Sequence, residues 1–220
     1  MTFIWMKQAL TSAEVVLPDV DSRWVAMHFV AFRFLIGTIS TLVILRASRS
    51  GFKDPEVWKG GFSLGLILIL GFLIQMVGLT DVTPAVSAFL TSLYVVFTAI
   101  MGVALGRQRI TSFMIFGVLL ATFGAGWISG PPRVEFGVGE WLTVISGFLF
   151  AMHIIVTDRV TRLVDPMQST GTMMVTVMVL AFGILVLDPL GYGGVGWFSN
   201  AVELMWSMDY VIPLALCGFF

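Results

Sequence analysis

Charged side chains are scarce in this chain of 220 residues. Asp, Glu, Lys and Arg make up 11% of it, whereas 58% of the residues are hydrophobic. A soluble globular domain carries about 25% charged residues, because its surface must be wetted. The mean hydropathy of +0.98 likewise indicates a predominantly apolar chain. Since the chain has too few polar groups to cover a surface in water, we expect an integral membrane protein surrounded by lipid.

Other absences exclude whole classes of protein. The formal net charge is −1, and no basic run is present that could bind a phosphate backbone, so nucleic acid is not an expected partner. Cys217 is the single cysteine and cannot form an intramolecular disulfide. The first ten residues lack the basic leader and the cleavage site of a signal peptide.

Motifs for catalysis and cofactor binding are also missing. The sequence has no His-Glu-x-x-His zinc motif, and no Ser-His-Asp set can be argued from it. The glycine-rich segment 191–196 contains no lysine and opens no evident βαβ unit, which speaks against a nucleotide site. We therefore expect no enzyme, no metal and no cofactor.

Apolar segments of about 18 residues or more are candidate membrane-spanning helices. Six such segments are present, at Trp24–Leu45, Trp58–Leu79, Pro84–Leu105, Thr111–Ser129, Gly139–Thr157 and Met167–Leu187. Lipid offers no partner to an unpaired backbone, and no alternating barrel strands are visible, so helix is the expected conformation. The predicted fold class is an all-α integral membrane protein built as a multi-helix bundle.

The apolar stretches at the two ends are shorter. Met1–Leu10 is too short to cross a bilayer, and Tyr210–Phe220 stops without a polar tail. We expect each to be part of a spanning helix, so that the chain is truncated at both ends, naturally or through a misread reading frame. The alternative is that both are short interfacial pieces.

Lys and Arg are distributed unevenly over the connections. Arg23 and Arg133 lie in one set of alternate connections, and eight cations lie in the other set. The eight are Arg46, Arg49, Lys53, Lys59, Arg107, Arg109, Arg159 and Arg162. Because cations accumulate in cytoplasmic loops, we expect the connections with eight cations to be cytoplasmic. The two remaining cations, Lys7 and Arg33, lie within apolar stretches.

The order of the segments suggests an internal repeat. Phe3–Leu10 and an acidic connection begin one half, and Phe150–Val160 followed by Asp165 begins a second, after the Gly- and Pro-bearing joint Ser129–Gly139. Five segments fill the first half, and an odd number makes the second half enter from the opposite side. The predicted domains are therefore residues 1–130 and residues 139–220, as an inverted repeat.

Four stretches resemble a known family. They are RFLIGTISTLVIL (Arg33–Leu45), QMVGLTDVTPAVSAFLTSLYVVFTAIMGVALGRQRIT (Gln75–Thr111), FGVLLATFGAGWISG (Phe116–Gly130) and GEWLTVISGFLFAMHIIVTDRVTRLVDPMQ (Gly139–Gln168). In order and spacing they resemble an EamA-type permease of the drug/metabolite transporter superfamily. Val95 stands where that family often has proline, so the resemblance leaves a helix kink at this point in doubt.

The resemblance implies a fold and a function. A full member has ten helices in two inverted five-helix repeats, of which this chain would hold about six complete and two partial helices. The implied function is a secondary transporter, a permease or exporter of small organic metabolites, amino acids or drugs across the cytoplasmic membrane of a bacterium, by alternating access. Its partners would be a small-molecule solute and the lipid bilayer, and a homo-oligomer is left open. The alternative is a non-transporting membrane scaffold or subunit, or an inert fragment of such a permease.

Hydroxyl groups form a stripe on the segment Pro84–Leu105. On an α-helix Ser87, Thr91, Tyr94 and Thr98 fall within a stripe roughly 60° wide. This pattern favours a wet cavity, which the family resemblance supports, because helix four of the family lines the central substrate site. The alternative is that each hydroxyl bonds back to a carbonyl of its own helix.

Four further polar residues are candidates. Gln75 needs a hydrogen-bond partner in lipid, and a cavity could supply one; His153 could titrate, or could be hydrogen-bonded within the packing. Arg33 lies near the middle of its segment, where a cation is a candidate for function, although we favour snorkelling or bonds to backbone carbonyls. Lys7 lies near the outer end of its stretch, and snorkelling is again the favoured interpretation.

Overall fold

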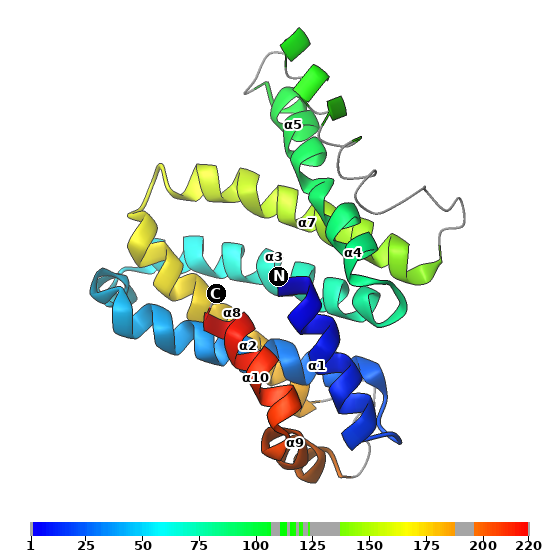
Figure 1. Ribbon diagram of the computed structural model, residues 1–220. Helices are drawn as coiled ribbons and strands as arrows, with labels where there is room; N and C mark the ends of the chain where they lie inside the picture. Colours follow the sequence, from blue (N-terminus) through cyan, green and yellow to red (C-terminus); the bar gives the residue numbers. More distant parts are fainter. Residues whose placement is uncertain are drawn as a thin grey trace.

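The computed structural model describes residues 2–106, 111–113, 115–117, 119–120, 123, 137–187 and 196–219. Throughout these ranges the regular structure is helical, with no strand among them (Figure 1). The helices are α1 (Thr2–Val16), α2 (Ser22–Ile44), α3 (Pro55–Asp81), α4 (Pro84–Ser92), α5 (Tyr94–Ala104), α7 (Val138–Val160), α8 (Pro166–Leu187), α9 (Trp197–Trp206) and α10 (Met208–Phe219). A 3-10 helix, η1 (Arg46–Lys53), connects α2 to α3.

Five of the predicted spans are confirmed as helices. The helices α2, α3, α7 and α8, and α4 taken together with α5, are each long and apolar enough to cross a membrane. The sixth predicted span, Thr111–Ser129, falls mostly outside the described residues. The helices α9 and α10 meet at a bend of 89° and pass the same test only as a pair. The chain is therefore an all-α, multi-pass membrane protein.

Three helix starts follow directly from the local sequence. The side chains of Asp21, Asp54 and Thr83 cap the first turns of α2, α3 and α4 by accepting hydrogen bonds from backbone N–H groups. Pro55 and Pro84 occupy the first positions of α3 and α4, where a missing N–H costs nothing. These caps end the connections at defined points and so fix where the spans begin.

The predicted span Pro84–Leu105 is interrupted at Leu93. The backbone N–H of Leu93 bonds to the carbonyl of Leu90, three residues back, at 3.2 Å. The hydroxyl of Ser92 donates to the carbonyl of Phe89 at 2.6 Å. This bond lies directly before the interruption between α4 and α5, which is present although Val95 is not proline. Figure 1 shows the far end of α5 extending away from the other helices, although α5 also packs against α7.

Glycines let α3 and α8 pack closely. A Cβ added at Gly61 would overlap Oγ1 of Thr172, and one at Gly65 would lie 2.8 Å from Cβ of Thr176. Thr172 also donates a hydrogen bond from Oγ1 to the carbonyl of Val57, at 3.2 Å. Small residues are the usual means of close helix contact in membranes, where dispersion forces drive association. As a result, α3 packs between α7 and α8 and becomes the centre of the described bundle.

The two short end segments pack on each other. The helices α1 and α10 are in contact, and Sγ of Cys217 lies 3.7 Å from the carbonyl oxygen of Thr2. A buried hydrogen bond of 2.8 Å between Nδ1 of His28 and the hydroxyl of Tyr210 ties α10 to α2. The ends of the described chain thus meet on one side of α2 (Figure 1).

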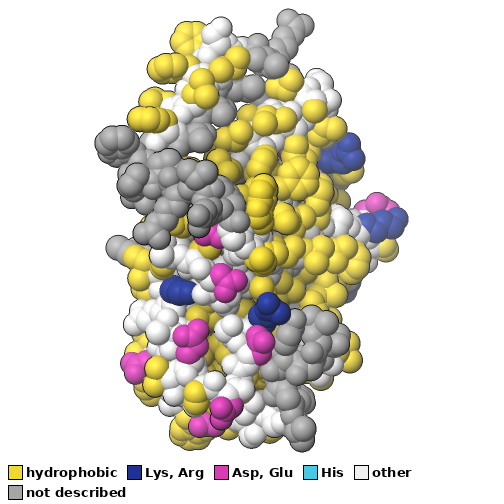
Figure 2. All heavy atoms as spheres, turned by 90° about the vertical axis from the view of Figure 1, so that its right-hand side faces the viewer, with side chains coloured by type: hydrophobic (Ala, Val, Ile, Leu, Met, Phe, Trp, Pro, Cys, Tyr) yellow, Lys and Arg dark blue, Asp and Glu magenta, His cyan; other side chains and the backbone are white. Residues whose placement is uncertain are grey.

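The outer surface is that of a membrane protein. Figure 2 shows hydrophobic side chains covering broad areas of one face, with most of the acidic side chains in view in its lower half. Large apolar side chains such as Ile100, Trp141 and Phe148 are exposed along α5 and α7. Exposed apolar surface of this kind is typical of a face that lipid covers.

Candidate functional site

A cavity of about 400 Å³ lies between α1, α2, α3, α4, α5 and α7. Five of the residues singled out from the sequence line it, namely Arg33, Gln75, Thr91, Tyr94 and His153. They come from four separate segments of the sequence, α2, α3, the α4–α5 pair and α7. The fold thus gathers polar groups that are as much as 120 positions apart in the chain around one space.

Gln75 and Thr91 form the best-defined polar contact at the cavity. The amide Nε2 of Gln75 donates to Oγ1 of Thr91 at 3.0 Å, and both residues are buried. This bond joins the C-terminal half of α3 to α4. Within the described residues no group bonds to the other amide atom, Oε1, so that it stays available as an acceptor.

His153 presents an unused ring nitrogen. Its Nε2 is buried and has no hydrogen-bond partner among the described residues. Buried polar atoms in native proteins are nearly always bonded, so an orphan nitrogen of a cavity-lining side chain calls for an explanation. A bound solute or water would supply the missing partner.

Arg33 lies at the cavity wall near the middle of α2. Its guanidinium carbon is 4.6 Å from the ring centroid of Phe72 and 5.9 Å from that of Phe34. Nη1 approaches the sulfur of Met6 at 3.6 Å. Because α2 begins at Ser22, Arg33 is a mid-helix residue. The sequence analysis favoured snorkelling or bonds to backbone carbonyls, but the described contacts of Arg33 include no side-chain bond to a carbonyl.

Lys7 has a different role from Arg33. Its Nζ donates to the carbonyls of Leu79 and Thr80, at 2.9 and 2.7 Å. These carbonyls belong to the last turn of α3, where backbone acceptors have no partner within the helix. A cation there is also favoured by the helix dipole. Lys7 is thus a C-terminal cap of α3 that fastens α1 to it, and it does not line the cavity.

Only part of the hydroxyl stripe faces the cavity. Thr91 and Tyr94 line the cavity, whereas Ser87 is buried outside it, with Oγ unbonded among the described residues. Thr98 donates to the carbonyl of Tyr94 on its own helix, at 2.7 Å. Two of the four predicted residues, one on each side of Leu93, thus line the cavity, and Ser87 and Thr98 do not.

The apolar part of the wall was not predicted from the sequence. It consists of Phe3, Met6, Leu68, Phe72, Phe150 and Ile154. Phe72 and Phe150 meet edge to face, with their centroids 5.2 Å apart. A usable signal existed, since Phe72 precedes Gln75 by three residues and Phe150 precedes His153 by three, the spacing of neighbours on one helix face.

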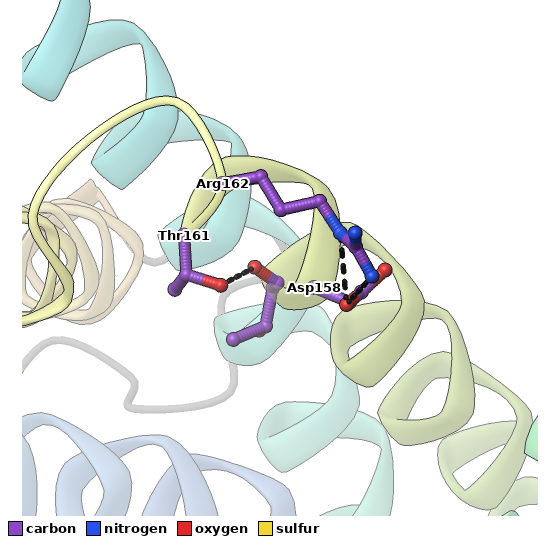
Figure 3. A network of polar contacts seen from close by, with 4 residues as sticks. Asp158, Thr161 and Arg162 are labelled. Carbon is purple, nitrogen blue, oxygen red and sulfur yellow. Dashed lines mark hydrogen bonds and ion pairs between the residues drawn. The ribbon is translucent and has the colours of Figure 1, made fainter.

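A separate polar cluster lies at the end of α7 (Figure 3). Nη2 of Arg162 pairs with Oδ1 of Asp158 at 2.9 Å, and Thr161 donates to the carbonyl of Thr157. The bond to Asp158 raises the pKa of Arg162 above its usual range. This cation is exposed and paired, in contrast to Arg33.

The chain is similar to a known protein family and to several curated proteins. The EamA-like transporter family matches residues 2–130. An uncharacterized transporter of Archaeoglobus fulgidus is 31% identical over 109 residues, covering 50% of this chain and 35% of the relative. The uncharacterized transporter YetK of Bacillus subtilis is 25% identical over 205 residues, covering 84% and 57% of the two chains. Probable purine permease 4 of Arabidopsis thaliana is 26% identical over 198 residues, covering 83% and 51%.

The matches cover only part of each relative. The chain spans between about a third and somewhat over half of the length of these curated relatives. No solved structure matches it. The names of the family and of the relatives are those of transporters rather than of enzymes. Since the family matches more than half of its residues, the chain belongs to the EamA-like transporter family.

Proposed function

We propose that this protein works as a secondary transporter of small organic solutes, such as metabolites, amino acids or drugs. The observation that carries the proposal is the convergence of Arg33, Gln75, Thr91, Tyr94 and His153 on one cavity between apolar helices. Polar and ionisable groups are costly within a bilayer, and they mark solute pathways when they face the interior of a bundle. A volume of about 400 Å³ suits a small organic molecule.

The proposed mechanism is alternating access. Residues 1–130 and 139–220 would form two inverted repeats, with the solute site between them near the middle of the membrane. The cavity fits this scheme, because α7, from the second proposed repeat, contributes His153 opposite residues from the first. The proposed location is the cytoplasmic membrane of a bacterium.

The test is solute flux across a defined membrane. The gene product is reconstituted into lipid vesicles and assayed with a labelled panel that includes an aromatic carboxylate, an amino acid, a cationic drug and a purine base. The purine base is included because one relative is named a probable purine permease. We expect saturable flux of at least one solute, which a Gln75→Leu variant with normal membrane content loses. Flux no greater than in protein-free vesicles would contradict the proposal and favour a non-transporting scaffold or fragment.

A further inference from the structure

Arg33 is an intramembrane cation whose hydrogen-bonding capacity is largely unused. A guanidinium has five N–H donors. Across the described part of the chain its only side-chain hydrogen bond goes to the sulfur of Met6, a weak acceptor, at 3.6 Å. The ring of Phe72 attracts the guanidinium electrostatically but uses no N–H donor. No Asp or Glu in those residues lies within ion-pairing distance of Arg33.

The donors of Arg33 have room for a ligand because the residue lines the cavity. Ionisable groups inside membrane bundles are normally paired with an opposite charge or with carbonyls. A planar guanidinium is suited to bind a carboxylate through two parallel hydrogen bonds. The counter-charge that the described residues do not provide can therefore come from the solute.

The rest of the wall indicates the other features of the solute. Phe72 and Phe150, edge to face at 5.2 Å, offer aromatic surface next to Arg33. On the polar side, Oε1 of Gln75 and Nε2 of His153 are the unused groups. A solute with one acidic group on an aromatic or apolar body would pair with the cation and pack against the two rings.

We infer that the transported solute is an organic anion, and that its carboxylate pairs with Arg33 while its apolar body packs against Phe72 and Phe150. This inference rests on the proposed function, because it takes the cavity as the solute site. It goes further by assigning the charge of the solute and the residue that selects for it.

The experiment compares three ligands of similar shape and different charge. Benzoate, benzamide and benzylamine are tested as protectants of a Thr91→Cys variant in which Cys217 is replaced by alanine, reconstituted in vesicles and reacted with a small aqueous thiol reagent. We expect benzoate to protect at concentrations about tenfold or more below those needed for benzamide, since a charge-assisted bond is added, and benzylamine to protect least.

Variants of the cation separate its role from general stability. In the same background, Arg33→Gln should abolish the preference for benzoate over benzamide, while Arg33→Lys should retain part of it through charge alone. Arg162→Gln, which removes a cation outside the cavity, should leave the preference unchanged. If Arg33→Gln does not fold, two measurements still test whether Arg33 pairs with the anion. They are the preference for benzoate in the Thr91→Cys variant that retains Arg33, and the partial retention of that preference in Arg33→Lys.

The two proposals fail in different ways. If the thiol of the Thr91→Cys variant did not react at all, the cavity would not be wet and the proposed function would be contradicted. If it reacted but benzoate protected no better than benzamide, or if Arg33→Gln kept the preference, the anion inference would be overturned while the cavity stood.

Discussion

The amide of Gln75 donates a hydrogen bond of 3.0 Å to the hydroxyl of Thr91 and so joins α3 to α4 at the wall of the cavity. Both partners are buried, and both line the cavity. The first prediction follows from this bond.

Removing both partners should cost less than the sum of removing each one alone. Gln75→Met or Thr91→Val should each destabilise the protein by about 1–3 kcal/mol, because a buried polar group then loses its partner. The double variant should be less destabilised than the sum of the two. Thermal unfolding in detergent measures the three values, and strict additivity would show that the two residues are not coupled.

The second prediction concerns neighbouring positions on α4. With Cys217 replaced by alanine, Thr91→Cys should react with a small aqueous thiol reagent, and Ser92→Cys should react much more slowly. Thr91 lines the cavity, whereas the hydroxyl of Ser92 is turned to the carbonyl of Phe89 on its own helix. Equal rates at the two positions would mean that reactivity follows membrane depth and not the cavity.

The third prediction tests the close packing of α3 on α8. Gly61→Ala should destabilise the protein by about 1–3 kcal/mol, because the added Cβ would overlap Thr172. Gly183→Ala is the matched control, since a Cβ there meets no atom within 4 Å. Alanine at that position should be neutral or stabilise the helix by up to about 1 kcal/mol. Similar melting temperatures of the two variants would contradict the contact.

The fourth prediction concerns the cap that Lys7 provides. Lys7→Met should lower the melting temperature, because the carbonyls of Leu79 and Thr80 lose their donor. Lys53→Met, at an exposed cation of η1, should have little effect. A Lys7→Met variant as stable as the parent would indicate that Lys7 is not needed to hold α1 on α3.

The fifth prediction is the orientation in the membrane. In a cysteine-free background, Ser50→Cys should be labelled only from the cytoplasmic side, and Asp19→Cys only from the opposite side. Both positions are exposed, so access is not limited by burial. Labelling of Ser50→Cys by an impermeant reagent added outside intact cells would reverse the assignment.

The sequence alone determined the environment of the chain and most of its helices. The low charge and the long apolar segments require lipid, and in lipid the backbone must bond within its own helix, so span positions follow from composition. Local capping signals such as Asp54-Pro55 then set the helix starts. Gln75 and Thr91 could also be selected from the sequence, because an amide or hydroxyl in an apolar segment needs a partner nearby.

Tertiary structure decided which of these groups meet. Lys7 and Arg33 look alike in sequence, as single cations in apolar stretches, but the packing of α1 on α3 places Lys7 on free carbonyls and Arg33 in the cavity. Thr91 likewise lines the cavity and Thr98 does not, although helical periodicity placed them on one face. Helix periodicity defines faces within one straight segment, whereas the direction each face points depends on contacts between segments far apart in the chain.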